Sequence, residues 1–147
     1  MNKFKFLKLS TITPSIEPGN PLFNANQIVS ILNTLKSDIA VFPELTLSGY
    51  QIGDLMYEGE FLEKVKTALS YILEKNTFRG VFVLGMPLYI ETSLYNCAVV
   101  IQENKILGII PKTHIPNYQE FYEYRWFASG KDVQTRNIQL LGQSVKF

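Results

Sequence analysis

The sequence predicts an α/β fold, because short buried strands alternate with amphipathic helices along the chain. Two segments, residues 24–36 and 60–75, repeat apolar side chains three and four positions apart, which is the pattern of a helix with one buried face. Two short apolar runs, residues 39–42 and 81–85, have the composition of strands buried on both sides. We therefore expect a layered α/β protein.

The other strands complete this order. Residues 4–13 alternate apolar with polar side chains and predict a first strand. The exposed face of that strand is expected to carry three lysines, Lys3, Lys5 and Lys8. Residues 94–102 and 106–110 flank a short polar turn and predict a hairpin. With a final strand at residues 137–147, the predicted order is β-α-β-α-β-β-β-loop-β.

Composition indicates a globular protein without an electrostatic partner. A chain of 147 residues fits one domain, and its formal net charge of +1 argues against binding to nucleic acid or to an anionic membrane. A single cysteine excludes an internal disulfide and favours a reducing compartment. No segment has the continuous apolar stretch of a signal peptide or membrane helix, so we expect a cytoplasmic protein.

Two charged residues come directly after predicted strands, where α/β folds gather their ligands. Glu44 follows an apolar strand and a proline, so we expect a partly buried carboxylate that acts as a general base. The alternative is a loop carboxylate bonded to the backbone. Lys112 could stabilise an oxyanion on an amide carbon, and the alternative is a solvated lysine at a strand end.

The single cysteine and the single histidine add neither a nucleophile nor a metal site to this pair. Cys97 falls in the middle of a strand, where we expect a buried, unreactive thiol. His114 has no cysteine or carboxylate partners at metal-ligand spacing. No glycine-rich phosphate loop occurs either, so we predict no metal site and no nucleotide site in this chain.

A long polar and aromatic segment, residues 111–130, separates the predicted hairpin from the last strand. Loops of this length inside a compact domain are usually functional or disordered, and the many aromatic side chains favour an ordered one. Aromatic rings with interspersed carboxylates suit a pocket for a small polar ligand. The alternatives are a packed surface loop and a subunit contact.

Several motifs, taken in their order, resemble the nitrilase (carbon–nitrogen hydrolase) superfamily. They are Val41-Phe42-Pro43-Glu44-Leu45 with Ser48-Gly49-Tyr50, Gly85-Met86-Pro87, Tyr95-Asn96-Cys97-Ala98, and Gly108 to Lys112. The segment from Lys112 to Phe127 looks like the amidase domain of glutamine-dependent NAD synthetases. The resemblance covers essentially the whole chain. It implies an incomplete four-layer α-β-β-α sandwich of the nitrilase type, with residues 1–147 as the N-terminal part of the amidase domain.

The resemblance also implies a reaction, in which a Glu–Lys–Cys triad hydrolyses glutamine and the ammonia serves NAD synthesis. Glu44 would be the general base, Lys112 would stabilise the oxyanion, and Glu123 would hold Lys112 or the substrate. Three aromatic residues would line the glutamine pocket or the mouth of an ammonia tunnel, namely Tyr50, Tyr118 and Phe121. ATP and magnesium are implied only for a synthetase domain that this chain lacks, and no cofactor is implied for residues 1–147.

The family nucleophile is expected in a Glu-x-Cys-Glu-Asp-like segment beyond the aromatic loop, and the chain ends at Phe147 without one. Cys97 does not match that position. We therefore expect the chain alone to be inactive and marginally soluble, and full-length relatives to form homo-oligomers. The expected partners are the remainder of the amidase domain and the synthetase domain. Two alternatives stay open: a fragment of a stand-alone amidase, and a non-catalytic scaffold.

Overall fold

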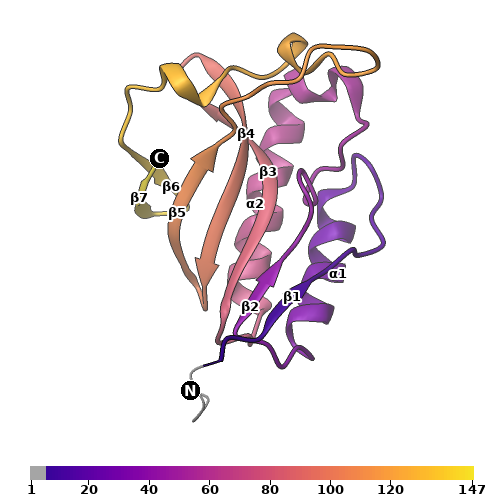
Figure 1. Ribbon diagram of the computed structural model, residues 1–147, viewed down its shortest axis with the longest axis vertical. Coiled ribbons are helices and arrows are strands. Elements are labelled where there is room, and N and C mark those ends of the chain that lie inside the picture. Colours follow the sequence, from indigo (N-terminus) through magenta and orange to yellow (C-terminus); the bar gives the residue numbers. More distant parts are fainter. Residues whose placement is uncertain (1–5) are drawn as a thin grey trace.

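The computed structural model describes residues 6–147, which form a mixed sheet with two helices on one face (Figure 1). The five strands lie in chain order across this sheet: β1 (Leu9–Thr11), β2 (Ile39–Val41), β3 (Val81–Ile90), β4 (Ser93–Gln102) and β5 (Lys105–Pro111). The pairs β1–β2 and β2–β3 are parallel, whereas β3–β4 and β4–β5 are antiparallel. The predicted α/β class and the 94–110 hairpin are confirmed.

The helices α1 (Pro21–Leu32) and α2 (Gly59–Lys75) pack on each other and on the sheet. Asn20 caps α1 by accepting a hydrogen bond from the Phe23 N–H, and Pro21 stands in the first turn, where no N–H is needed. The helix begins and ends earlier than predicted. It ends because the Asn33 side chain bonds across to the chain after α2, accepting from the Thr77 N–H at 2.7 Å.

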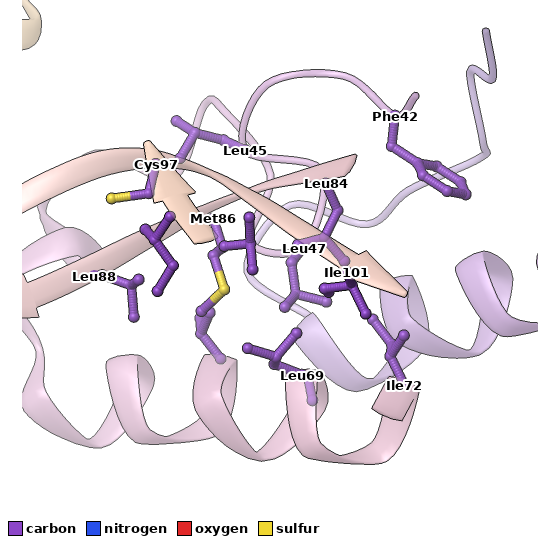
Figure 2. Close-up of a cluster of buried hydrophobic side chains, with 14 of the residues drawn as sticks. Phe42, Leu45, Leu47, Leu69, Ile72, Leu84, Met86, Leu88, Cys97 and Ile101 are labelled. Atoms are coloured by element: carbon purple, nitrogen blue, oxygen red, sulfur yellow. The ribbon is translucent and has the colours of Figure 1, made fainter. Parts of the chain in front are cut away.

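The main core lies between these helices and one face of the sheet. Alternate residues of β3 supply its centre and are fully buried: Phe82, Leu84, Met86 and Leu88. Figure 2 shows Leu69 and Ile72 of α2 below Met86 and Ile101 of the sheet. The opposite face carries Val41, Val83, Ala98 and Ile110, and no helix of the described chain covers it (Figure 1).

Strand β3 extends beyond its predicted end at residue 85. Gly85 continues the strand, and β2 pairs with β3 only as far as Val83. Pro87 therefore lies where the β2 side of the strand is free, and a proline is tolerated at such an edge. The extra length brings Asn96 of β4 into register with Pro87, close to the ends of β2 and β5.

Two other predicted strands differ from the structure. Residues 137–147 form a hairpin, β6 (Asn137–Leu140) and β7 (Gln143–Lys146), and not a single strand. Its turn, Leu141-Gly142, has positive φ at both residues, as a two-residue hairpin turn of type I′ requires. The first strand is shorter than predicted, and Lys8 precedes it. The predicted positions Lys3, Phe4 and Lys5 lie outside the described residues.

Within residues 6–147, no helix is both long and apolar enough to cross a bilayer.

Candidate functional site

The loop after β2 brings Glu44 against the sheet. The chain turns sharply at Leu45, which has φ of 51°, and the Leu47 N–H donates to the carbonyl of Gly85 at 3.1 Å. A Cβ atom on Gly85 would lie 2.2 Å from the backbone nitrogen of Leu45, so only glycine lets this loop approach β3 so closely. Sequence motifs around residues 44 and 85 are thus one packed unit.

Lys112 is fixed through its backbone on two sides. Its N–H donates to the carbonyl of Asn96 in β4 at 2.8 Å, and its carbonyl accepts from the Gly130 N–H at 2.8 Å. Gly130 packs tightly there, because an added Cβ would lie 2.8 Å from the carbonyl oxygen of Pro111. The lysine side chain therefore leaves the end of the sheet from an anchored backbone.

Glu123 comes from the aromatic loop and is buried. It begins a single 3-10 turn, Glu123–Arg125, and its carbonyl accepts from the N–H groups of Trp126 and Phe127 at 3.0 and 2.9 Å. Its own N–H donates to the carbonyl of Pro116 at 3.2 Å. These bonds close the loop on itself, and the predicted ordered loop is confirmed.

The three side chains meet at one ammonium group. The Nζ of Lys112 lies 2.8 Å from Oε1 of Glu44, and 3.1 and 3.0 Å from Oε1 and Oε2 of Glu123. Tyr50 donates its hydroxyl to Oε1 of Glu123 at 2.6 Å, and the side-chain amide of Asn96 donates to Oε1 of Glu44. One cation is thus shared by two carboxylates, each of which also accepts from one neutral donor.

The pKa shifts in this cluster keep its donors protonated. Burial alone would lower the pKa of Lys112, but its hydrogen bonds and charge interactions with Glu44 and Glu123 outweigh that effect and raise it. The pKa of the Tyr50 hydroxyl is raised by burial and then by its bond to Glu123. At neutral pH Lys112 is therefore a cationic donor and Tyr50 a neutral one, and neither is a base.

A cavity of about 390 Å³ opens beside the cluster. Glu44, Asn96 and Lys112 contribute its polar lining. The rest is the uncovered apolar face of the sheet, with Val41, Val83, Ala98 and Ile110. The arrangement places a carboxylate and an ammonium at the end of an apolar pocket, which suits a small molecule with one polar reacting group.

The three predicted aromatic residues are only partly brought together. Tyr50 and Phe121 line a second cavity of about 280 Å³ on the aromatic-loop side of Glu123. Tyr118 is exposed, and its ring packs edge-on against Phe121 at 5.8 Å between centroids. Tyr118 borders neither of the two cavities next to the cluster.

Cys97 and His114 lie outside the cluster. Cys97 is 2% exposed, and Figure 2 shows it among core side chains, including Met86 and Leu88. The buried position expected for this thiol is confirmed, and burial raises its pKa, which disfavours the reactive thiolate. His114 is exposed. Among the side chains that the structure describes, no three from His, Cys, Asp or Glu are grouped closely enough to hold a metal ion.

The two carboxylates differ in exposure. The Glu44 side chain lines the cavity and is 43% exposed, so it is partly buried, as expected. The more enclosed carboxylate is Glu123, whose side chain is 4% exposed. The position of Glu44 after a buried strand predicted its partial burial, whereas the sequence did not indicate that Glu123 would be the more buried of the two.

Two features of the site were missed in the sequence. Asn96 is buried and bonds to Glu44, and an isolated amide within an apolar strand was the available signal. The other is a surface cluster in which Asp54 accepts from Nε and Nη2 of Arg125 at 2.9 and 2.7 Å and from Nε1 of Trp126 at 3.0 Å. These hydrogen bonds lower the pKa of Asp54 to about 2. No sequence pattern pairs residues so far apart.

Comparison with known proteins gives glutamine-dependent NAD(+) synthetases among the relatives. No family model matches the chain. The chain is 37% identical to the glutamine-dependent NAD(+) synthetase of Mycobacterium bovis over 97% of its length, and 37% identical to that of Aquifex aeolicus over 96%. It covers 21% and 25% of these two proteins, so it spans about a fifth to a quarter of the relatives it matches.

Solved structures agree on the fold. The glutamine-dependent NAD+ synthetase of Acinetobacter baumannii, solved with ADP, superposes with a TM-score of 0.79 at 28% identity, over 94% of this chain and 26% of that one. A variant of an amidase of the nitrilase superfamily from Nesterenkonia superposes with a TM-score of 0.70 at 16% identity, over 95% of this chain and 54% of that one. The second similarity shows the fold alone.

Proposed function

Because the chain is homologous to the N-terminal part of glutamine-dependent NAD(+) synthetases and has a nitrilase-type fold, we propose that its Glu44–Lys112–Glu123 cluster serves amide hydrolysis with glutamine as substrate. The observation that carries the proposal is the single ammonium of Lys112 held between two carboxylates, only one of which is accessible. A base and an oxyanion donor side by side are what acyl transfer needs.

In this proposal each group has one task. Glu44 takes the proton of a thiol, and the resulting thiolate bonds to the amide carbon. Lys112 donates a hydrogen bond to the oxygen that becomes negative. As the carbon–nitrogen bond breaks, Glu44 returns the proton to the departing ammonia. Water then cleaves the thioester, with Glu44 as base again, and releases glutamate.

The thiol is proposed to come from outside these 147 residues. The only cysteine in the sequence, Cys97, lies under the sheet in the core and keeps its proton. The 147-residue chain alone is therefore expected to release no ammonia from glutamine. The wider activity carries over as a proposal from the name of the relatives: the ammonia would serve NAD formation. That this step uses ATP and magnesium in a synthetase domain, in the cytoplasm, is proposed from the family resemblance of the sequence alone.

The test is a chimaera in which residues 1–147 replace the matching stretch of the Aquifex aeolicus relative. We expect the chimaera to release ammonia from glutamine, and its Glu44→Gln and Lys112→Met variants to lose about 10²- to 10⁴-fold in rate. Glu74→Gln, an exposed change on α2, is the matched control and leaves the rate unchanged. Full activity of the Glu44→Gln chimaera, or glutaminase activity of the 147-residue chain alone, would contradict the proposal.

A stand-alone amidase is the competing enzyme, favoured only by the shared fold of the Nesterenkonia protein. The same chimaera separates the two. If it releases ammonia from short aliphatic amides in preference to glutamine, the amidase is the better description. If the chimaera is folded but hydrolyses neither kind of amide, a scaffold role replaces both.

A further inference from the structure

Asn96 connects the two sides of the candidate site. It lies in β4 with 3% of its surface exposed, on the sheet face that lines the 390 Å³ cavity. Its carbonyl accepts from the backbone N–H of Lys112 at 2.8 Å, and its side-chain amide donates to Oε1 of Glu44. A single residue therefore holds the backbone of the lysine and the side chain of the glutamate.

These bonds treat the two oxygens of Glu44 unequally. Oε1 accepts from both the Asn96 amide and the Lys112 ammonium, the latter at 2.8 Å. Within the described residues 6–147, no donor contacts Oε2. A carboxylate has lone pairs on both oxygens, and an oxygen already engaged by two donors is the poorer proton acceptor. Oε2 is therefore the oxygen left available to accept a proton.

On the basis of the proposed function, we infer that Asn96 is a positioning residue that, with Lys112, holds Glu44 by Oε1 so that Oε2 is the oxygen that accepts the proton. A second donor is needed because Lys112 is shared with Glu123 and cannot fix Glu44 alone. The donor has to be neutral, since a further charge would change the balance of one ammonium between two carboxylates.

Asn96 is then needed for its amide donor and not only for its volume. Asn96→Leu keeps the approximate volume and removes the donor. Asn96→Asp keeps the shape but replaces the donor with an acceptor that repels Glu44. If Asn96 only packed, the two variants would differ from the parent in stability and not in the rate constant of the chemical step.

The kinetic test uses the chimaera that carries residues 1–147. We expect Asn96→Leu to lower kcat about 10- to 100-fold with little change in KM, and Asn96→Asp to lower it at least as much. In a Glu44→Gln background, the same Asn96→Leu change should lower kcat no further, because Asn96 acts through Glu44. Losses that multiply in the double variant, or an unchanged kcat for Asn96→Leu, overturn the inference.

A second measurement needs no activity. Urea unfolding of the 147-residue chain and its Asn96→Leu, Glu44→Gln and double variants gives the coupling between the two side chains. We expect the unfolding equilibrium constant of the double variant to differ about 5-fold or more from the value that the two single variants predict together. The pair Asn96→Leu with Glu74→Gln, on separate elements, should be independent. Independence of Asn96 and Glu44 overturns the inference even if the chimaera cannot be assayed.

The two proposals fail in different ways. An active Glu44→Gln chimaera removes the proposed function and, with it, the role of Asn96. If Glu44→Gln inactivates the chimaera but Asn96→Leu retains the parental kcat, only the inference about Asn96 fails. A folded chimaera that is inactive without any substitution contradicts the proposed function, and the unfolding measurement still decides whether Asn96 and Glu44 are coupled.

Discussion

The two carboxylates that share Lys112 stand in opposite surroundings. Glu44, on the loop after β2, is 43% exposed and uses one oxygen for its bonds. Glu123, on the aromatic loop, is 4% exposed and accepts from Lys112 through both oxygens and from Tyr50 through one. One residue meets solvent and the other is enclosed by its own loop.

The difference indicates a division of tasks. An exposed carboxylate with a free oxygen can exchange a proton, whereas a buried carboxylate engaged on both oxygens holds its partner in place. Burying an unpaired charge is costly, so Glu123 depends on Lys112 for its stability in a way that Glu44 does not. Variants at the two glutamates should therefore separate activity from stability.

The largest expected effect is on activity at Glu44. In the chimaera, Glu44→Gln should reduce glutamine hydrolysis about 10²- to 10⁴-fold, because a neutral amide cannot take the proton. The free energy of unfolding of the 147-residue chain should fall by about 1 kcal/mol or less, because the side chain is partly exposed and loses only its bonds through Oε1. Ammonia release and urea unfolding measure the two quantities. A large loss of stability would contradict the comparison.

Glu123→Gln should give the opposite pattern. The amide keeps the size of the side chain but loses the charged bonds to Lys112 in a buried setting, so the free energy of unfolding should fall by about 2 kcal/mol. Tyr50→Phe removes only one neutral donor to the same carboxylate and should cost about 1 kcal/mol. Urea unfolding of the three proteins gives the order. Equal stability of wild type and Glu123→Gln would show that the burial of Glu123 has no energetic consequence.

High pH should destabilise the cluster, because Lys112 then loses its charge. Its folded-state pKa is raised, so the stability it contributes is present below its ordinary pKa, near 10, and is lost as the pH rises through the raised value. The raised pKa of Tyr50 acts in the same direction. Stability should fall above about pH 10, and less steeply in Lys112→Met. Unfolding curves from pH 8 to 11 measure this, and identical slopes would count against the charge cluster.

The smallest effect is expected at Asp54, on the outer side of the Glu123 loop. The bonds from Arg125 and Trp126 lower the pKa of Asp54 to about 2, so its contribution is present above its ordinary pKa near 4 and is lost as the pH falls through 2. Asp54→Asn should remove this dependence. It should also speed hydrogen exchange at the Trp126 and Phe127 amides, which bond to Glu123. Unchanged exchange would mean that the cluster does not support the loop.

Local sequence patterns predicted most elements of the fold. Apolar periodicity placed α2 within one residue of its start, and the hairpin of β4 and β5 followed from two strands and a short turn. The predicted ends of elements were wrong where residues from another part of the chain determine them. Asn33 ends α1 through a bond to Thr77, and the free edge beside β3 lets the strand continue past Pro87.

The sequence by itself determined that Glu44 and Lys112 follow strands, that Cys97 lies within one, and that the chain resembles a nitrilase-type amidase domain. Tertiary structure decided which side chains meet, which glutamate is buried, and that Asn96 bonds to Glu44 across 52 positions of the chain. The physical reason is that periodicity reports which face of an element is buried. The distance between side chains and the exposure of a carboxylate depend on loops and neighbours that only the folded chain brings together.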